Sequence, residues 1–151
     1  MKTSISSIFV ASALFFSSCT SKDAVPAASN APFSAKLGTE VFTSPDAKLM
    51  IAASNTIAAF AKDSKGRTFG IAIFEKDFPF NKAVNVAFSP SISYIDEKKA
   101  VYIAESGTMT IISYTKNSAG TVTNIKGIFG VVLTAGVAKI TVTDGKFDLS
   151  K

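Results

Sequence analysis

The groups that could do chemistry in this chain are carboxylates, lysines, tyrosines and hydroxyls, because the sequence contains no histidine and a single cysteine. Without histidine there is no Ser-His or Cys-His catalytic pair and no histidine-based metal site. The acidic candidates are the adjacent pair Asp96 and Glu97 and the isolated Glu105. Neighbouring residues of a strand point to opposite faces, so the pair suits a solvated turn better than a joint acid–base site. We therefore predict no enzyme activity, no metal site and no cofactor.

The single cysteine, Cys19, follows an apolar N-terminal run that begins soon after Lys2. A basic start, an apolar core of about 7–15 residues and small residues before the cut are typical of a secretory signal. The run is too short for a permanent membrane span, which needs about 20 apolar residues. Residues 14–19 resemble a lipobox, the cleavage and acylation signal of bacterial lipoproteins. The sequence thus predicts a signal peptide over residues 1–18 and lipidation of Cys19.

An ordinary signal peptide, cut near Ser18, is the alternative for this segment. Phe16 and Ser18 depart from the usual lipobox, in which Gly or Ala precedes the cysteine. A cut without acylation would leave Cys19 as a lone free thiol, which is unusual for a protein in an oxidising compartment. Lipidation is therefore the preferred interpretation. Each buried methylene would contribute ~0.8 kcal/mol, and two or more acyl chains would hold the protein stably at a membrane.

Residues 19–32 are expected to connect this anchor to a folded domain over residues 33–151. After Cys19 the segment contains no large side chain except Val25, so it cannot bury enough apolar surface to order itself. A flexible coil of this length reaches roughly 20 Å. Such a tether would hold the domain just off a membrane surface.

The distribution of charge argues against a nucleic-acid partner. The chain has 16 basic and 11 acidic residues, and all but one of the basic residues are lysines spread along the sequence. Nucleic-acid binders cluster their basic residues and favour arginine. Scattered lysines are instead typical of solvated strand faces and protected sheet edges.

The loop over residues 75–82 is the most unusual segment, because Phe78 and Phe80 flank a proline between charged residues. Exposed aromatic side chains often anchor interfaces, so Phe78 and Phe80 are the candidate binding loop. The alternative is that both rings fold back as a plug over one end of the core, since phenylalanine is readily buried.

Three tyrosines form a second, weaker candidate. A tyrosine offers a flat apolar ring and a polar tip, so Tyr94, Tyr102 and Tyr114 could line a sugar-binding face. Packing in the core or at its rim is the ordinary role of such residues.

From residue 33 onward the chain is a succession of β-like runs separated by turn signals. Residues 137–143 alternate cleanly between apolar and polar side chains, and Asp144 and Gly145 then form a strong hairpin signal. Residues 106 and 107 are likewise expected in a turn. Many short strands at this spacing predict an all-β fold, a single antiparallel β-sandwich or barrel-like domain of about 8–10 short strands.

One segment, residues 45–55, leaves helix and strand both open. Ser44, Pro45 and Asp46 make a good helix start, and the following apolar residues fall near helical spacing. The β-branched content and the turn-like Ser54 and Asn55 favour strands.

The domain resembles the small lipoproteins of Bacteroidota that carry one all-β domain after a lipobox. Four segments carry the resemblance. A Phe-x-Ala strand precedes a glycine turn at residues 33–38, and a Gly-Thr-x-Thr-Ile strand lies at residues 107–111. A glycine-rich strand with phenylalanine lies at residues 126–130, and the domain closes with Ile-Thr-x-x-x-Gly-x-Phe at residues 140–147. The resemblance covers most of residues 33–149, although residues 80–84 depart from the family's central strand. It implies a fold and a location in the cell envelope, and it carries no activity.

The expected function is that of an outer-membrane lipoprotein, facing the periplasm or the cell surface, that binds a glycan or an envelope protein. A structural or assembly subunit of the envelope is the alternative. A carboxylate-based hydrolase ranks third, because it needs two carboxyl groups about 5–9.5 Å apart across a cleft. Its carboxylates would come from Asp77, Asp96, Glu97 and Glu105.

Overall fold

The computed structural model describes residues 30–52, 56–74, 79–87 and 91–151. The expectations for residues 1–18, Cys19, Asp77 and Phe78 lie outside these ranges. The described residues form ten β-strands and no helix. The strands are β1 (Phe33–Leu37), β2 (Glu40–Ser44), β3 (Lys48–Ala52), β4 (Thr56–Lys62), β5 (Thr68–Phe74), β6 (Val84–Asn85), β7 (Ser91–Ile95), β8 (Val101–Lys116), β9 (Val122–Ala135) and β10 (Ala138–Ser150).

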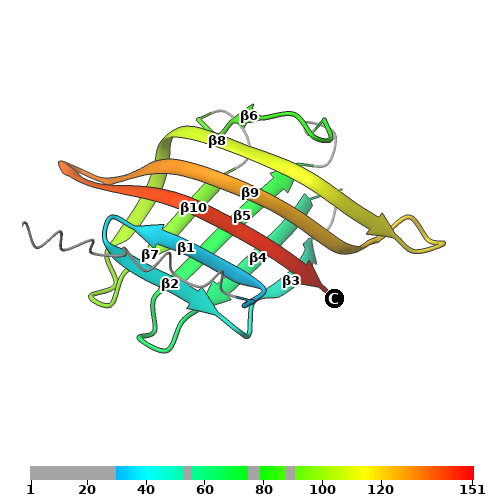
Figure 1. Cartoon of the computed structure of the whole chain (residues 1–151), viewed down its shortest axis with the longest axis horizontal. Coiled ribbons are helices and arrows are strands. Elements are labelled where there is room, and N and C mark those ends of the chain that lie inside the picture. The colour runs from blue at the N-terminus through cyan, green and yellow to red at the C-terminus, as the bar shows by residue number, and fades with distance from the viewer. Residues whose placement is uncertain (1–29, 53–55, 75–78, 88–90) are drawn as a thin grey trace, which may run out of the picture.

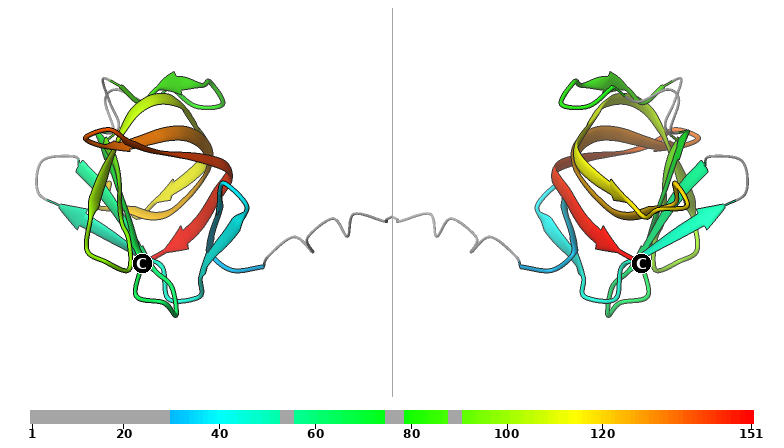
Figure 2. Two further views of the ribbon diagram at one scale, coloured as in Figure 1. Left: turned by 90° about the vertical axis from the view of Figure 1, so that its left-hand side faces the viewer. Right: turned by 90° about the vertical axis from the view of Figure 1, so that its right-hand side faces the viewer.

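All ten strands belong to one antiparallel sheet with the order β2-β1-β10-β9-β8-β7-β5-β4-β3, and β6 pairs with β8 off this path. The sheet curls into a half-barrel, in which β8, β9 and β10 cross β4, β5 and β7 on opposite sides of the core (Figure 1). Figure 2 shows the strands curling around a common centre. The predicted all-β, antiparallel, barrel-like fold is confirmed.

The curl is made at two corners where a strand passes from one side of the half-barrel to the other. At the first corner, β2 pairs with β1, and after residues 45–47 the chain continues as β3, which pairs with β4. At the second corner, the start of β8 pairs with β7. The register of β8 shifts between Ala104 and Ser106, and beyond this point β8 pairs mainly with β9. Bulges and bends of this kind let one strand take part in two sheet layers. The two edge strands, β2 and β3, are therefore consecutive in the chain and are separated by the bend at residues 45–47.

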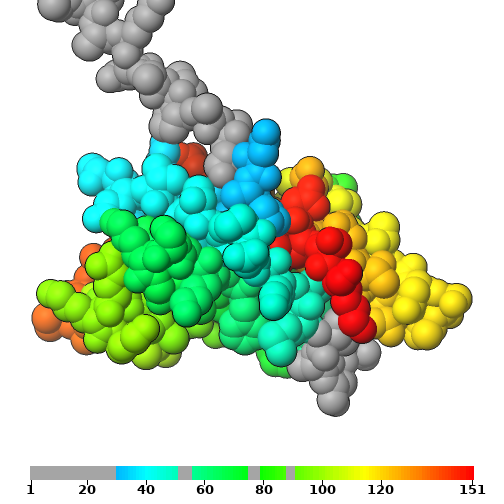
Figure 3. All heavy atoms as spheres, turned by 90° about the horizontal axis from the view of Figure 1, so that it is seen from below, coloured from blue at the N-terminus to red at the C-terminus, as the bar shows by residue number. Residues whose placement is uncertain are grey.

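The two ends of the domain are joined through β1 and β10. Phe33 of β1 lies opposite Phe147 of β10 in the antiparallel register. The end of β10 also lies next to β3, as the space-filling view from below shows in red and teal (Figure 3). The first and last strands thus hold each other in place.

The core of the half-barrel is rich in aromatic rings. Phe33, Phe42, Phe69 and Phe129 contact one another at centroid distances of 4.9–6.0 Å. Phe147 joins this cluster through Phe129, and Tyr94 joins it through Phe69. Each buried ring removes about 150–250 Å² from water, and ring pairs at these distances add further stabilisation. Five of the 13 phenylalanines of the chain lie in this cluster.

Two predicted turns are wrong, because both lie inside continuous strands. Asp144 and Gly145 do not end a hairpin; they form an irregularity within β10, where Asp144 has φ 52°. Gly145 is required there because a Cβ atom would lie 2.6 Å from the carbonyl oxygen of Phe129. Ser106 and Gly107 likewise lie within β8. In both places glycine permits close strand approach, and the sequence signal for this is the same as for a turn.

The open choice between helix and strand over residues 45–55 is settled for the described part. Residues 48–52 form the strand β3, so the favoured strand interpretation is confirmed there. Within the described ranges, the chain contains no helix of the length and apolarity needed to cross a membrane.

Candidate functional site

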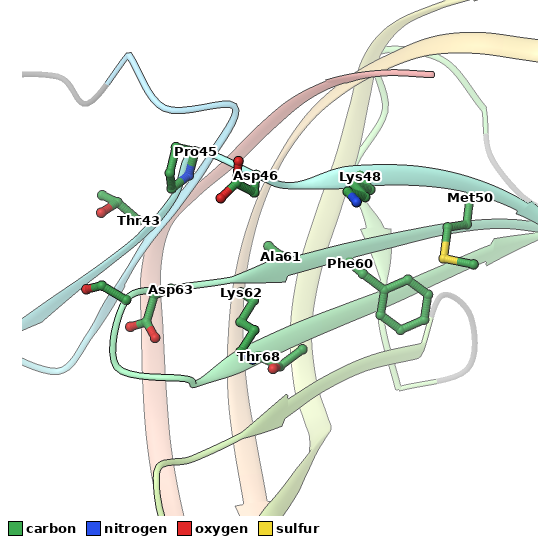
Figure 4. Close-up of a pocket in the computed structure, with 11 residues that line it drawn as sticks. Thr43, Pro45, Asp46, Lys48, Met50, Phe60, Ala61, Lys62, Asp63 and Thr68 are labelled. Atoms are coloured by element: carbon green, nitrogen blue, oxygen red, sulfur yellow. The ribbon is translucent and has the colours of Figure 1, made fainter.

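A groove of about 760 Å³ lies on the outside of the half-barrel, where β2 separates from β4 at the first corner (Figure 4). Its walls come from the end of β2 and the connection to β3, from the outer faces of β3 and β4, and from the β4–β5 hairpin. The residues that line it are Thr43, Pro45, Asp46, Lys48, Met50, Phe60, Ala61, Lys62, Asp63, Ser64 and Thr68.

The groove exists because side chains, rather than a strand ladder, join β2 to β4 and β5. The hydroxyl oxygen of the fully buried Ser44 accepts a hydrogen bond from the backbone N–H of Lys62 at 3.0 Å. Arg67 directly precedes β5, and its Nη2 donates a hydrogen bond to the backbone carbonyl of Val41 at 3.3 Å. These contacts fix β2 beside β4 and leave a crease between their outer faces.

The β4–β5 hairpin is held by one buried carboxylate. Asp63 accepts hydrogen bonds from the backbone N–H groups of Lys65 and Arg67, at 3.0 and 2.9 Å. Its second oxygen accepts from Arg67 Nε at 2.6 Å, and both side chains are almost fully buried. Gly66, with φ 79°, completes the turn in a conformation that glycine adopts without strain. This wall of the groove is therefore rigidly placed.

Arg67 extends the network to β2. Its Nη1 donates to Glu40 at 2.7 Å, and its guanidinium lies 5.7 Å from the centre of the Phe42 ring. Burial works against the charge of Arg67, but the hydrogen bond and ion pair with Asp63 outweigh it and raise the pKa of Arg67. Hydrogen bonds and charges of Lys65 and then Arg67 hold the pKa of Glu40 below its ordinary value. Both shifts favour the charged forms of Arg67 and Glu40 at neutral pH.

The apolar part of the groove consists of Phe60 and Met50, which are 45% and 55% exposed. Phe60 lies on the outer face of β4, because the alternate residues Ile57, Ala59 and Ala61 point into the core. Its ring leans over Gly70 of β5, with Cε1 3.7 Å from where a Cβ of that residue would lie. Figure 4 shows the Phe60 ring beside Met50 among the residues that line the groove.

Two lysines flank the Phe60 ring. Lys48 of β3 lies directly opposite Phe60 in the register, and Lys62 follows two residues later on the same face of β4, opposite Thr68. Within the described ranges, neither lysine forms an ion pair. The groove thus combines an exposed aromatic ring with two lysines that have no described carboxylate partner, and the exposed carboxylate of Asp46 lies at its rim.

A second cavity, of about 710 Å³, lies on the other side of Arg67 and carries three carboxylates, Glu40, Asp96 and Glu97. Each of them already has a partner. Glu40 accepts from Arg67, Asp96 accepts from the backbone N–H of Ala100 at 2.8 Å, and Glu97 lies 3.8 Å from Lys65 Nζ. Lys65 and Arg67 hold the pKa of Glu40 below its ordinary value, whereas a general acid requires a raised pKa.

Of the predicted binding loop, the structure describes Phe80 but not Phe78. Phe80 is 46% exposed, and its ring stacks on Tyr114 of β8 with a centroid distance of 4.2 Å. The backbone N–H of the next residue, Asn81, donates to Ile111 of β8. Phe80 therefore contacts the end of β8 while keeping part of its ring exposed, and it lies outside the lining of the groove.

The other candidates are dispersed over the fold. Tyr94 is buried and contacts Tyr102 at 5.9 Å, whereas Tyr114 contacts Phe80, so the three tyrosines form no common face. Glu105 is exposed on β8 and pairs with Lys139 at 2.8 Å. It does not line the cavity that contains Asp96 and Glu97.

The groove residues Met50, Phe60, Lys48 and Lys62 were not singled out from the sequence. The sequence did contain a pattern that indicates an exposed Phe60. The buried positions of β4 alternate along the strand, and Phe60 falls between them although its side chain is large and aromatic. The two lysines could not be assigned to it, since their proximity depends on the register of β3 and β4.

Among the described residues, no three acidic side chains gather in an arrangement that could hold a metal ion. No family model, no curated protein and no solved structure matches this chain.

Proposed function

We propose that this chain is an exported lipoprotein, anchored in the outer membrane through Cys19 and facing the periplasm or the cell surface, whose half-barrel binds a ligand without transforming it. The lipobox-like segment before Cys19 supports the anchor. The observation that carries the binding role is the outer groove, where the exposed Phe60 has Lys48 opposite it on β3 and Lys62 two residues along β4. Concave sites with an apolar surface and a few polar groups are typical ligand sites.

A binding role is favoured over catalysis by the state of the carboxylates. Glu40, Asp96 and Glu97 share a cavity, but each is engaged by a cation or a backbone N–H group. The lowered pKa of Glu40 favours its ionised form, which cannot donate a proton as a glycosidase acid must. The one arginine is buried in an ion pair, which leaves no arginine for nucleic-acid phosphates.

The anchor is tested with Cys19→Ser. We expect the processed wild-type chain to enter the detergent phase of a Triton X-114 partition and its N-terminal peptide to carry a diacylglycerol mass. The Cys19→Ser chain should stay in the aqueous phase. An unmodified thiol on the processed wild-type chain would refute the anchor without affecting the groove.

A structural or assembly role is the second candidate, and the outer face of β8 favours it. Val101 and Ile103 point to solvent and are more than half exposed, and the tip of the β9–β10 hairpin presents a fully exposed Val137. Self-association would bury these side chains. Analytical ultracentrifugation of the Cys19→Ser chain distinguishes the two roles, because the binding role needs only a monomer.

A further inference from the structure

We propose that the groove binds an anionic saccharide, a pyranose chain that bears carboxylate or sulfate groups. This inference rests on the proposed binding function and specifies the ligand class for the same groove. Three features carry it: an exposed aromatic ring, two unpaired ammonium groups beside it, and hydroxyl groups along the rim.

The aromatic ring supplies the stacking surface. Phe60 is almost half exposed, and no described aromatic ring packs against it, whereas the core phenylalanines contact one another. The small Gly70 lets the ring lean onto β5. The face of an aromatic ring carries negative charge density, which attracts the polarised C–H groups on the flat side of a pyranose. Met50 extends this apolar surface along β3.

The two lysines supply the preference for negative charge. Among the described residues, Lys36, Lys65, Lys126 and Lys139 are paired with carboxylates, whereas several other lysines, such as Lys82 and Lys146, form no described ion pair. Lys48 and Lys62 likewise have no carboxylate partner within the described part of the chain. Cβ atoms of directly opposed residues lie about 5 Å apart, and same-face neighbours along a strand about 7 Å apart. Both ammonium groups can therefore reach the substituents of a sugar that stacks on Phe60.

The rim favours a saccharide over an acidic peptide. Thr43, Ser64 and Thr68 present hydroxyl groups from three different elements, which can bind the hydroxyl groups of a sugar. A peptide would bind an edge strand through its backbone. Among the strands of the groove, β4 and β5 are paired on both sides, whereas β2 and β3 are edge strands of the sheet. A peptide would therefore add along the edge of β2 or β3, whereas Phe60, Lys48 and Lys62 lie on the outer face of the sheet, where only side chains are available.

The experiment uses the Cys19→Ser chain, which keeps every described residue, and follows amide signals by NMR during titration with four probes. The probes are trigalacturonate, a heparin-derived tetrasaccharide, the neutral maltotriose and pentaglutamate. We expect saturable binding of trigalacturonate, of the heparin fragment, or of both, with the largest shifts at Lys48, Phe60 and Lys62. The pair of anionic probes separates carboxylated from sulfated ligands. Raising the ionic strength should weaken binding, because the lysines are exposed.

Two variants and two matched controls test the assignment. Phe60→Ala and the double variant Lys48→Gln with Lys62→Gln should each weaken binding about tenfold or more, as loss of a central contact does. Phe74→Ala removes an equally exposed ring from the neighbouring strand β5, outside the groove, and should leave binding unchanged. Lys82→Gln removes an exposed lysine in the turn before β6 and should also have no effect.

The outcomes separate the ligand class from the groove. If maltotriose bound as tightly as the anionic sugars, or if only pentaglutamate bound, the anionic saccharide would be refuted as the ligand class. Weaker binding of that probe by Phe60→Ala would still identify the groove as a binding site. Anionic sugars that shift residues elsewhere, or that bind Phe60→Ala normally, would refute the groove itself. Absence of saturable binding by both anionic sugars would also overturn the inference. If the inference holds and Cys19 is unmodified, only the membrane anchor fails.

Discussion

Arg67 illustrates how one side chain can set the geometry of a whole corner. It is the single arginine of the chain, and its three nitrogens contact Asp63, Glu40 and the backbone of Val41. A lysine could not make these three contacts, because its ammonium is a point charge without the planar fork of a guanidinium. The ion pair with Asp63 is buried, so its loss leaves the Asp63 carboxylate with two backbone hydrogen bonds but no cation.

We expect Arg67→Met to lower the free energy of unfolding by about 3–5 kcal/mol, the usual cost of breaking a buried ion pair. Lys65→Met removes an exposed contact to the same Glu40 and should cost less than about 1 kcal/mol. Urea unfolding followed by circular dichroism measures both. Similar values for the two variants would contradict the structural role of Arg67.

Glu40 gives a pH-dependent prediction. Its pKa is lowered, first by the hydrogen bond and charge of Lys65 and then by Arg67. Because the folded-state pKa is depressed, Glu40 stabilises the fold above its ordinary pKa of 4.5, and this contribution disappears as the pH falls through the lower, folded-state pKa. Lys65→Gln should raise the pKa of Glu40 toward the ordinary value without reaching it, since Arg67 is still present. Carboxyl NMR titration detects the shift, and an unchanged pKa in the variant would contradict this assignment.

At the scale of elements, the sequence predicted strands well and their connections less well. Strands β1 and β4 are among the short β-like runs that turn signals separate in the sequence. The long strands β8 and β10 were each predicted as two strands separated by a glycine turn. The distinction depends on partners far away in the sequence: Gly145 lies against Phe129, and Gly107 against Gly130 and Val131. The local sequence does not indicate which distant residues will lie against a glycine. The groove could not be predicted for the same reason, because it also depends on strand pairing.

Gly107 is the glycine whose replacement should matter most. It has φ 124°, and a Cβ atom there would collide with the carbonyl oxygen of Gly130 and lie 2.5 Å from Val131 Cα. Gly120, with φ 77°, is a matched control because no atom lies within 4 Å of its Cβ position. We expect Gly120→Ala to cost about 1–2 kcal/mol from the backbone conformation alone. Gly107→Ala should cost clearly more, as measured by thermal unfolding; equal costs would contradict the proposed role of close strand approach.

For the molecule as a whole, the described strands hold a continuous core that begins at Phe33 and ends at Leu149. All of these core residues follow residue 32, and the contact of the preceding described segment with the sheet includes the hydrogen bond from Asp148 N–H to the carbonyl of Pro32. We therefore expect residues 30–151, produced without the preceding segment, to fold with a β-rich circular dichroism spectrum. Their free energy of unfolding should match that of the Cys19→Ser chain to within about 0.5 kcal/mol, the usual size of surface effects. A domain that unfolds without residues 1–29 would contradict an independent fold.

The pairing of β1 with β10 has a consequence for the order of events during biosynthesis. Phe33 meets Phe147, so the opening strand has no permanent neighbour on one side until the final residues have been made. Contacts between such distant positions close slowly, on the millisecond-to-second scale typical of β-rich topologies. The polypeptide should thus stay unfolded for some time after synthesis, as the proposed export would require, and a nascent chain that lacks only its last dozen residues should be readily degraded.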